Sequence, residues 1–175
     1  MTKSKVIRMT NCKIIDDYID LVKSGKYRVC REQIQLIKFV ENVFENEEIY
    51  VDEEQLEKYL ALQKYFPYKL FEWEKFCFAL HNCTYSAPGV LRFPDLVCVV
   101  GRGTGKNGYL AFEDFALVTP VNGVRNYDID ICATSEEQAQ TSFNDIYEIL
   151  ENNASKMQRS TSGIERYHRQ KVWHL

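Results

Sequence analysis

The sequence predicts an α/β fold in which an incomplete, mostly parallel sheet follows an α-helical N-terminal region. Two runs carry this prediction, because the apolar residues 96–100 (LVCVV) and the alternating residues 127–134 (YDIDICAT) both have the pattern of a strand. A helical pattern follows each run, and this alternation is typical of parallel sheets. We therefore expect the strand around Leu96–Val100 at the centre, the strand around Ile129–Thr134 beside it, and a right-handed connection between them.

Residues 1–65 are expected to form the helical N-terminal region. Apolar residues recur at helical spacing from Cys12 to Ser24, and again from Arg31 to about Asn46. Asp52 and Gln55 resemble the capping box of a third helix, which the pair Phe66-Pro67 should end. The apolar stripes of these helices are interpreted as packing faces.

The most aromatic stretch of the chain covers residues 66–76 and leads into a helix that should end near Asn82. Rings of this kind can sandwich a flat base such as adenine, and a neighbouring acceptor can bind its N6 amino group. Trp73 and Glu74 are the candidates for these two roles. The alternative for Trp73 is a place in the core stripe of the helix, together with Phe76 and Leu80.

A glycine-rich segment at residues 101–106 (GRGTGK) follows the end of the first predicted strand, and a helical pattern begins directly after it. Glycines let successive N–H groups converge on phosphate oxygens, and the helix that follows presents its positive end to the same anion. Lys106 would then reach the β- and γ-phosphates. The common phosphate-loop pattern would have glycine at Val100 and a Mg²⁺-binding hydroxyl at Asn107, so this is a deviant Walker A motif. The alternative is an ordinary strand–helix connection with a solvated lysine.

After the second predicted strand, Ser135 is expected to cap a helix that begins with Glu136 and Glu137. Carboxylates at this place complement the helix dipole, and we interpret both residues in that way. Catalytic carboxylates are the alternative.

Composition limits the class of protein. The chain has 175 residues with 22 basic and 25 acidic side chains, and both of its ends are basic. It contains neither a membrane-spanning apolar segment nor a signal-peptide pattern, so we expect a location inside a cell. The six cysteines form no C-x-x-C pair, which makes a zinc or disulfide scaffold an unfavourable interpretation.

With these motifs in place, the chain resembles the large terminase subunit of tailed bacteriophages, an ATP-driven DNA-packaging motor. Three segments carry the resemblance: the deviant Walker A at 101–106, the aromatic-Trp-Glu segment Phe71–Phe76, and the segment Ala133–Ala139 after the second strand. The resemblance covers about residues 10–153. It implies a P-loop NTPase-type sheet, ATP and Mg²⁺ as cofactors, and a location in the cytoplasm of the bacterial host.

The resemblance also implies roles for single residues and partners. Arg102 and Lys106 would be catalytic, and Asn107 would replace the hydroxyl that binds the metal. Nucleotide would bind to Trp73 and Glu74 and to the loop, whose members are Gly101, Arg102, Gly103, Thr104, Gly105, Lys106 and Asn107. The implied partners are double-stranded DNA, the portal protein and the small terminase subunit. No membrane partner is expected, and an oligomer of this chain is compatible with the resemblance.

The departures from the family shape the expected function. No Walker B run follows Thr134, and the coupling motif and the nuclease domain are also absent from the sequence. We expect helical residues 1–65, the first part of an ATPase domain at 66–153 and a divergent basic tail at 154–175, as in a truncated or frameshifted gene product. Such a chain would bind ATP but not hydrolyse it. The alternatives are a non-catalytic prophage remnant or module that binds DNA, portal or small terminase subunit, and a small P-loop kinase, for which a lid and an acceptor site are missing.

Overall fold

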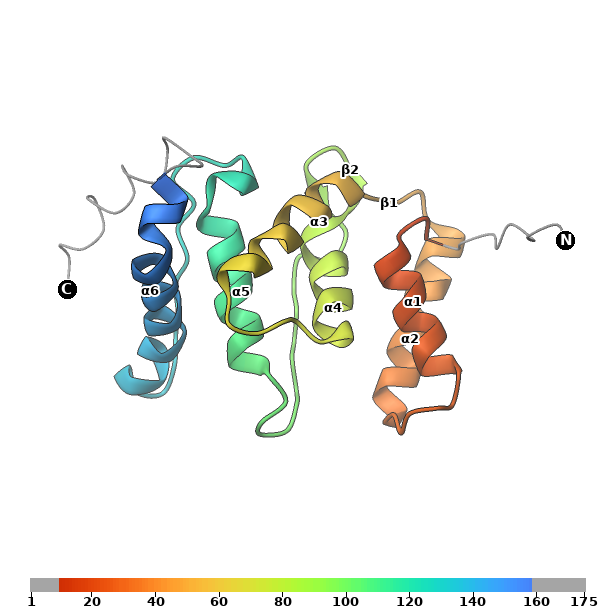
Figure 1. Ribbon diagram of the computed structural model, residues 1–175. Coiled ribbons are helices and arrows are strands. Elements are labelled where there is room, and N and C mark those ends of the chain that lie inside the picture. Colours follow the sequence, from red (N-terminus) through yellow and green to blue (C-terminus); the bar gives the residue numbers. More distant parts are fainter. Residues whose placement is uncertain (1–9, 159–175) are drawn as a thin grey trace, which may run out of the picture. The chain divides into compact units, whose positions relative to one another are not determined.

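The computed structural model describes residues 10–158, which are mostly helical and fall into two compact units. Unit 1 contains the described residues up to Leu56 together with Phe71–Cys98, and unit 2 contains Glu57–Leu70 together with the described residues from Val99 onward. Most of the predicted tail at 154–175 lies outside the described residues. In chain order the elements are α1 (Lys13–Lys23), α2 (Arg31–Asn46), β1 (Tyr50–Val51), α3 (Glu53–Leu60), the 3₁₀ helix η1 (Ala61–Tyr65), α4 (Glu72–Cys83), β2 (Thr84–Ala87), β3 (Val90–Leu91), α5 (Lys106–Val118), the 3₁₀ helix η2 (Pro120–Asn122) and α6 (Glu136–Gln158) (Figure 1).

The predicted parallel sheet is wrong. The described sheet has three short antiparallel strands in the order β1-β2-β3, with Tyr50 opposite Tyr85 and Tyr85 opposite Leu91. Strands β2 and β3 form a hairpin whose turn contains Gly89 at a positive φ of 75°. The rings of Tyr50 and Tyr85 stack with centroids 5.5 Å apart. This sheet belongs to unit 1 and precedes the glycine-rich loop.

Neither run predicted as a core strand forms a strand among the described residues. Residues 96–100 and 129–134 form no strand pair with any described segment. The expected right-handed connection between two parallel strands is therefore also absent from the described residues. The exposed fractions of Val97 and Val99 are 87% and 90%, whereas Ile129 and Ile131 are half-buried between exposed neighbours. Alternating apolar residues favour extended backbone with one covered face, but a strand also needs a neighbour that accepts its hydrogen bonds.

The helices of the N-terminal region lie where the apolar periodicity predicts them. α1 ends just before Gly25, which has a positive φ of 66°, and α2 ends at Asn46. The predicted cap of α3 is confirmed, because the N–H of Gln55 donates to Oδ1 of Asp52 at 2.9 Å. Each of these boundaries depends on contacts within a few residues of sequence.

Unit 1 has a core between α1 and α4. The rings of Tyr18 and Phe76 lie 4.5 Å apart, and Phe76 and Phe78 are fully buried. The guanidinium of Arg92 binds the carboxylate of Glu47 through two hydrogen bonds, of 2.5 and 2.8 Å. This fork-shaped contact joins the end of α2 to the segment that follows β3, and it lowers the pKa of the exposed Glu47 carboxyl.

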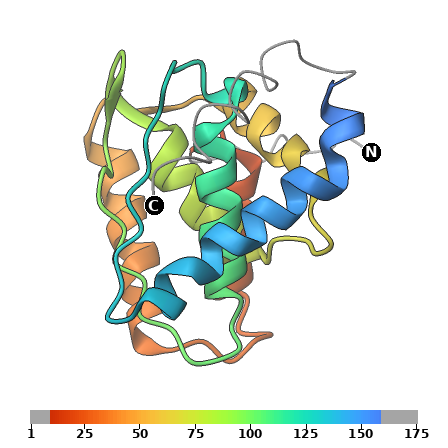
Figure 2. The same cartoon turned by 90° about the vertical axis from the view of Figure 1, so that its left-hand side faces the viewer.

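Unit 2 is built around the contact between α5 and α6, which lie next to each other in Figure 1, while in Figure 2 α6 crosses in front of α5. Phe66 packs edge-to-face against Phe112 and Phe115, with both pairs of ring centroids 5.4 Å apart. The hydroxyl of Tyr59 donates to Oδ1 of Asn122 at 2.8 Å, which links α3 to η2, the 3₁₀ helix that follows α5. The buried face of α5 therefore holds residues 57–70 and α6 in one unit.

No helix of the described residues is long and apolar enough to cross a membrane. The six cysteines are all free thiols, and burial raises the pKa of the Cys83 thiol to about 12.

Candidate functional site

The glycine-rich loop forms a tight turn that leads directly into α5. Gly103 and Gly105 both have positive φ angles, of 78° and 96°, which side chains with a Cβ rarely adopt. The hydroxyl of Thr104 donates to the carbonyl oxygen of Gly101 at 2.8 Å and so closes the loop across three residues. The N–H of Tyr109 donates to the carbonyl of Gly105, which makes Gly105 the first acceptor of the helix. The loop therefore needs glycine at these two positions.

The first turn of α5 presents a set of unpaired donors. Within the described residues, no hydrogen bond takes up the N–H groups of Lys106, Asn107 and Gly108. The side chains of Arg102 and Lys106 are exposed and form no ion pair with any described residue. N–H groups at a helix N-terminus, flanked by two cations, are an arrangement that can bind an anion.

These residues fit the phosphates of ATP better than they fit its metal ion. The exposed Asn107 amide is the one oxygen donor that the sequence placed at the metal position. The described residues contain no group of three His, Cys, Asp or Glu side chains that could hold a metal. Mg²⁺ would thus rely on Asn107, phosphate oxygens and water, and bound Mg²⁺ would supply charge neutralisation of the phosphates.

Tyr68 contacts the same helical turn, and sequence reasoning did not single it out. Its hydroxyl donates to the carbonyl oxygen of Gly108 at 3.0 Å. A Cβ at Gly108 would lie 3.2 Å from two ring carbons of Tyr68, so glycine lets the ring lie against the helix. Its ring also packs edge-to-face on Phe66 at 5.4 Å. Sequence patterns are local and do not reveal a contact between Tyr68 and Gly108, which are 40 positions apart. The sequence showed only that residues 66–76 are rich in aromatic side chains.

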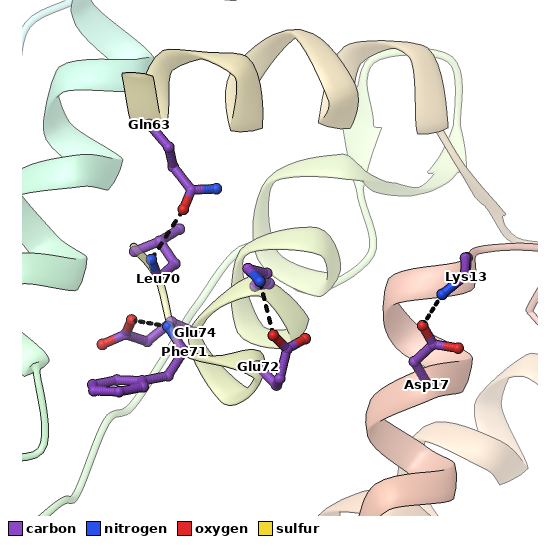
Figure 3. A network of polar contacts seen from close by, with 8 residues as sticks. Lys13, Asp17, Gln63, Leu70, Phe71, Glu72 and Glu74 are labelled. Atoms are coloured by element: carbon purple, nitrogen blue, oxygen red, sulfur yellow. Dashed lines mark hydrogen bonds and ion pairs between the residues drawn. The ribbon is translucent and has the colours of Figure 1, made fainter. Parts of the chain in front are cut away.

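The two residues predicted to bind the base lie at the start of α4, in unit 1. Oε2 of Glu74 accepts the N–H of Phe71 at 2.7 Å, so this carboxylate caps the helix (Figure 3). Glu74 is only 2% exposed, and burial raises the pKa of its carboxyl. Trp73 is half-buried. Trp73 and Glu74 belong to unit 1 and the glycine-rich loop belongs to unit 2. Their role in binding a base stays a prediction.

The side chain of Gln63 holds the end of the segment that contains Tyr68, and both belong to unit 2. Oε1 of Gln63 accepts the N–H of Leu70 at 3.0 Å and closes the segment that contains Tyr68 (Figure 3). This contact spans seven residues and fixes both ends of the loop around Tyr68. Gln63 is therefore a positioning residue for the Tyr68 segment.

Asp114, half-buried on α5, should make the stability of the protein depend on pH. Burial, with a smaller contribution from Glu113, raises the pKa of its carboxyl from 3.8 to about 6. A raised pKa favours the folded state while the group is protonated, so this stabilisation is complete below pH 3.8 and is lost as the pH rises through 6. Asp114→Asn should raise the free energy of unfolding at pH 7 by about 1–2 kcal/mol, a value reduced for the solvent contact that remains.

Urea unfolding at pH 3.5, 5 and 7 measures this effect, and Asp130→Asn, at an exposed position, is the matched control. The Asp114 variant should lose the difference between low and neutral pH that the native chain shows. Equal pH dependence in both variants would contradict the assignment.

Known protein families, characterised proteins and solved structures show no match to this chain. The local geometry is that of a glycine-rich loop at a helix N-terminus with unpaired N–H donors, an arrangement that can bind an anion.

Proposed function

We propose that this chain binds ATP through the loop Gly101–Lys106, as an ATP-binding fragment of the terminase large-subunit type. The observation that carries the proposal is the set of free N–H groups at the start of α5, between the exposed side chains of Arg102 and Lys106. The order of the three motif segments along the chain adds support. Double-stranded DNA, the portal protein and the small terminase subunit are the partners that the resemblance suggests.

Each residue of the loop has a distinct task in this proposal. The N–H groups of the first turn of α5 donate to phosphate oxygens, and Lys106 pairs with the β- and γ-phosphates. Arg102 contacts the γ-phosphate, where a guanidinium can neutralise charge. Gly103 and Gly105 allow the backbone to turn its donors toward the anion.

The proposed activity is binding without hydrolysis. Hydrolysis needs a positioned water and a metal held by the protein, in addition to a phosphate cradle. Glu136 and Glu137 occupy the first turn of α6, where they complement the helix dipole, as the sequence predicts.

Phosphate release from the purified protein with ATP and Mg²⁺ tests this absence of hydrolysis. We expect a rate equal to that of a sample without protein, for both the native chain and Lys106→Ala. Steady turnover that disappears in Lys106→Ala would contradict the proposal and would require a catalytic carboxylate. Glu136→Gln and Glu137→Gln would then identify it.

A further inference from the structure

A hollow of about 320 Å³ lies in unit 2, between residues 65–68 and residues 145–153 of α6. Its walls include the rings of Tyr65 and Tyr68, the ring of Pro67 and the side chain of Ile149. Two carboxylates, Asp145 and Glu148, also line it, and the proposed function assigns no role to either.

Tyr68 joins this hollow to the anion-binding loop. The same side chain that lines the hollow donates its hydroxyl proton to the carbonyl of Gly108. Gly108 lies two residues after Lys106, a rise of about 3 Å along the helix axis. Contacts with Phe66 and Gly108 hold the Tyr68 ring in one place, and its exposed fraction is 36%.

We propose that the hollow between residues 65–68 and α6 binds the base and ribose of the nucleotide whose phosphates lie on the loop Gly101–Lys106. This inference rests on the proposed function and deepens it. The ring of Tyr68 stacks on the base, and the carboxylates of Asp145 and Glu148 accept hydrogen bonds from the ribose hydroxyls or from the amino group of adenine.

The charges of unit 2 orient the ligand. The carboxylates of the hollow repel a triphosphate, whereas Arg102 and Lys106 attract it, so the two ends of a nucleotide bind at different places. Asp145 and Glu148 lie three residues apart on one face of α6. Burial and the neighbouring Glu148 raise the pKa of the Asp145 carboxyl, so hydrogen-bond donors would relieve this unfavourable pairing.

Calorimetric titration with two ligands, ATP and inorganic tripolyphosphate, tests this inference separately from the proposed function. The native chain should bind ATP at least tenfold more tightly than tripolyphosphate. The double variant Asp145→Asn, Glu148→Gln should bind ATP about tenfold more weakly, because the amides are weaker acceptors than carboxylates, and should bind tripolyphosphate no more weakly than the native chain does. Glu151→Gln, an exposed carboxylate of α6 outside the hollow, is the matched control and should change neither affinity.

Four results would overturn the inference. Equal affinities of the native chain for the two ligands, or equal ATP affinities of the double variant and Glu151→Gln, would leave the phosphate site standing and remove the base site. Weaker ATP binding by Glu74→Gln but not by the double variant would place the base at Trp73 and Glu74. A native chain that binds neither ligand would refute the proposed function and the inference together.

Discussion

Lys106→Ala should weaken ATP binding by about ten- to a hundredfold. The substitution removes an ammonium group next to the free N–H groups of α5 and leaves phosphate charge without its partner. A hydrogen bond to a charged group contributes about 1.5–3 kcal/mol, which corresponds to this range of affinity. Because the side chain is exposed and makes no ion pair with a described residue, we expect little change in stability.

Calorimetry with ATP and with tripolyphosphate measures the loss, and both ligands should show it. Lys38→Ala, which removes an exposed ammonium from α2, is the control for the general effect of charge. If Lys106→Ala and Lys38→Ala bind ATP equally well, Lys106 does not contact phosphate and the loop is an ordinary connection between two segments.

Phe112→Ala should lower the free energy of unfolding by about 3–5 kcal/mol, the usual cost of truncating a buried aromatic ring. Phe112 is fully buried on α5, where Phe66 packs edge-to-face against its ring. The cavity left by the ring would weaken the packing of residues 65–68 against α5, the helix that follows the glycine-rich loop. We therefore expect ATP affinity to fall as well, in proportion to the fraction of unfolded chain.

Chemical denaturation monitored by circular dichroism provides this value. Phe143→Ala makes the same change at a position of α6 that is 56% exposed, and its effect should stay within about 0.5 kcal/mol. Similar losses in the two variants would mean that α5 does not form the core of unit 2.

Features that depend on residues close together in the chain could be predicted from the sequence. The helix starts at Arg31, Lys106 and Glu136, the cap at Asp52 and the glycine-rich turn follow from residues within four positions of one another. Glycine conformations and helix caps are local because their energies depend on backbone angles and on hydrogen bonds across one turn. The position of the glycine-rich loop at the start of α5 was predictable for this reason.

Which apolar residues pack against a partner depends on contacts between segments that are distant in the chain. The run at 96–100 has the pattern of a buried strand, yet Val97 and Val99 are exposed, since no described strand lies beside them. The contact between Tyr68 and Gly108 and the hollow beside α6 join segments 40 or more residues apart. Strand pairing and ring packing depend on where distant segments meet. Hydrophobic periodicity indicates which face of a segment is buried, but it does not show which other segment covers that face.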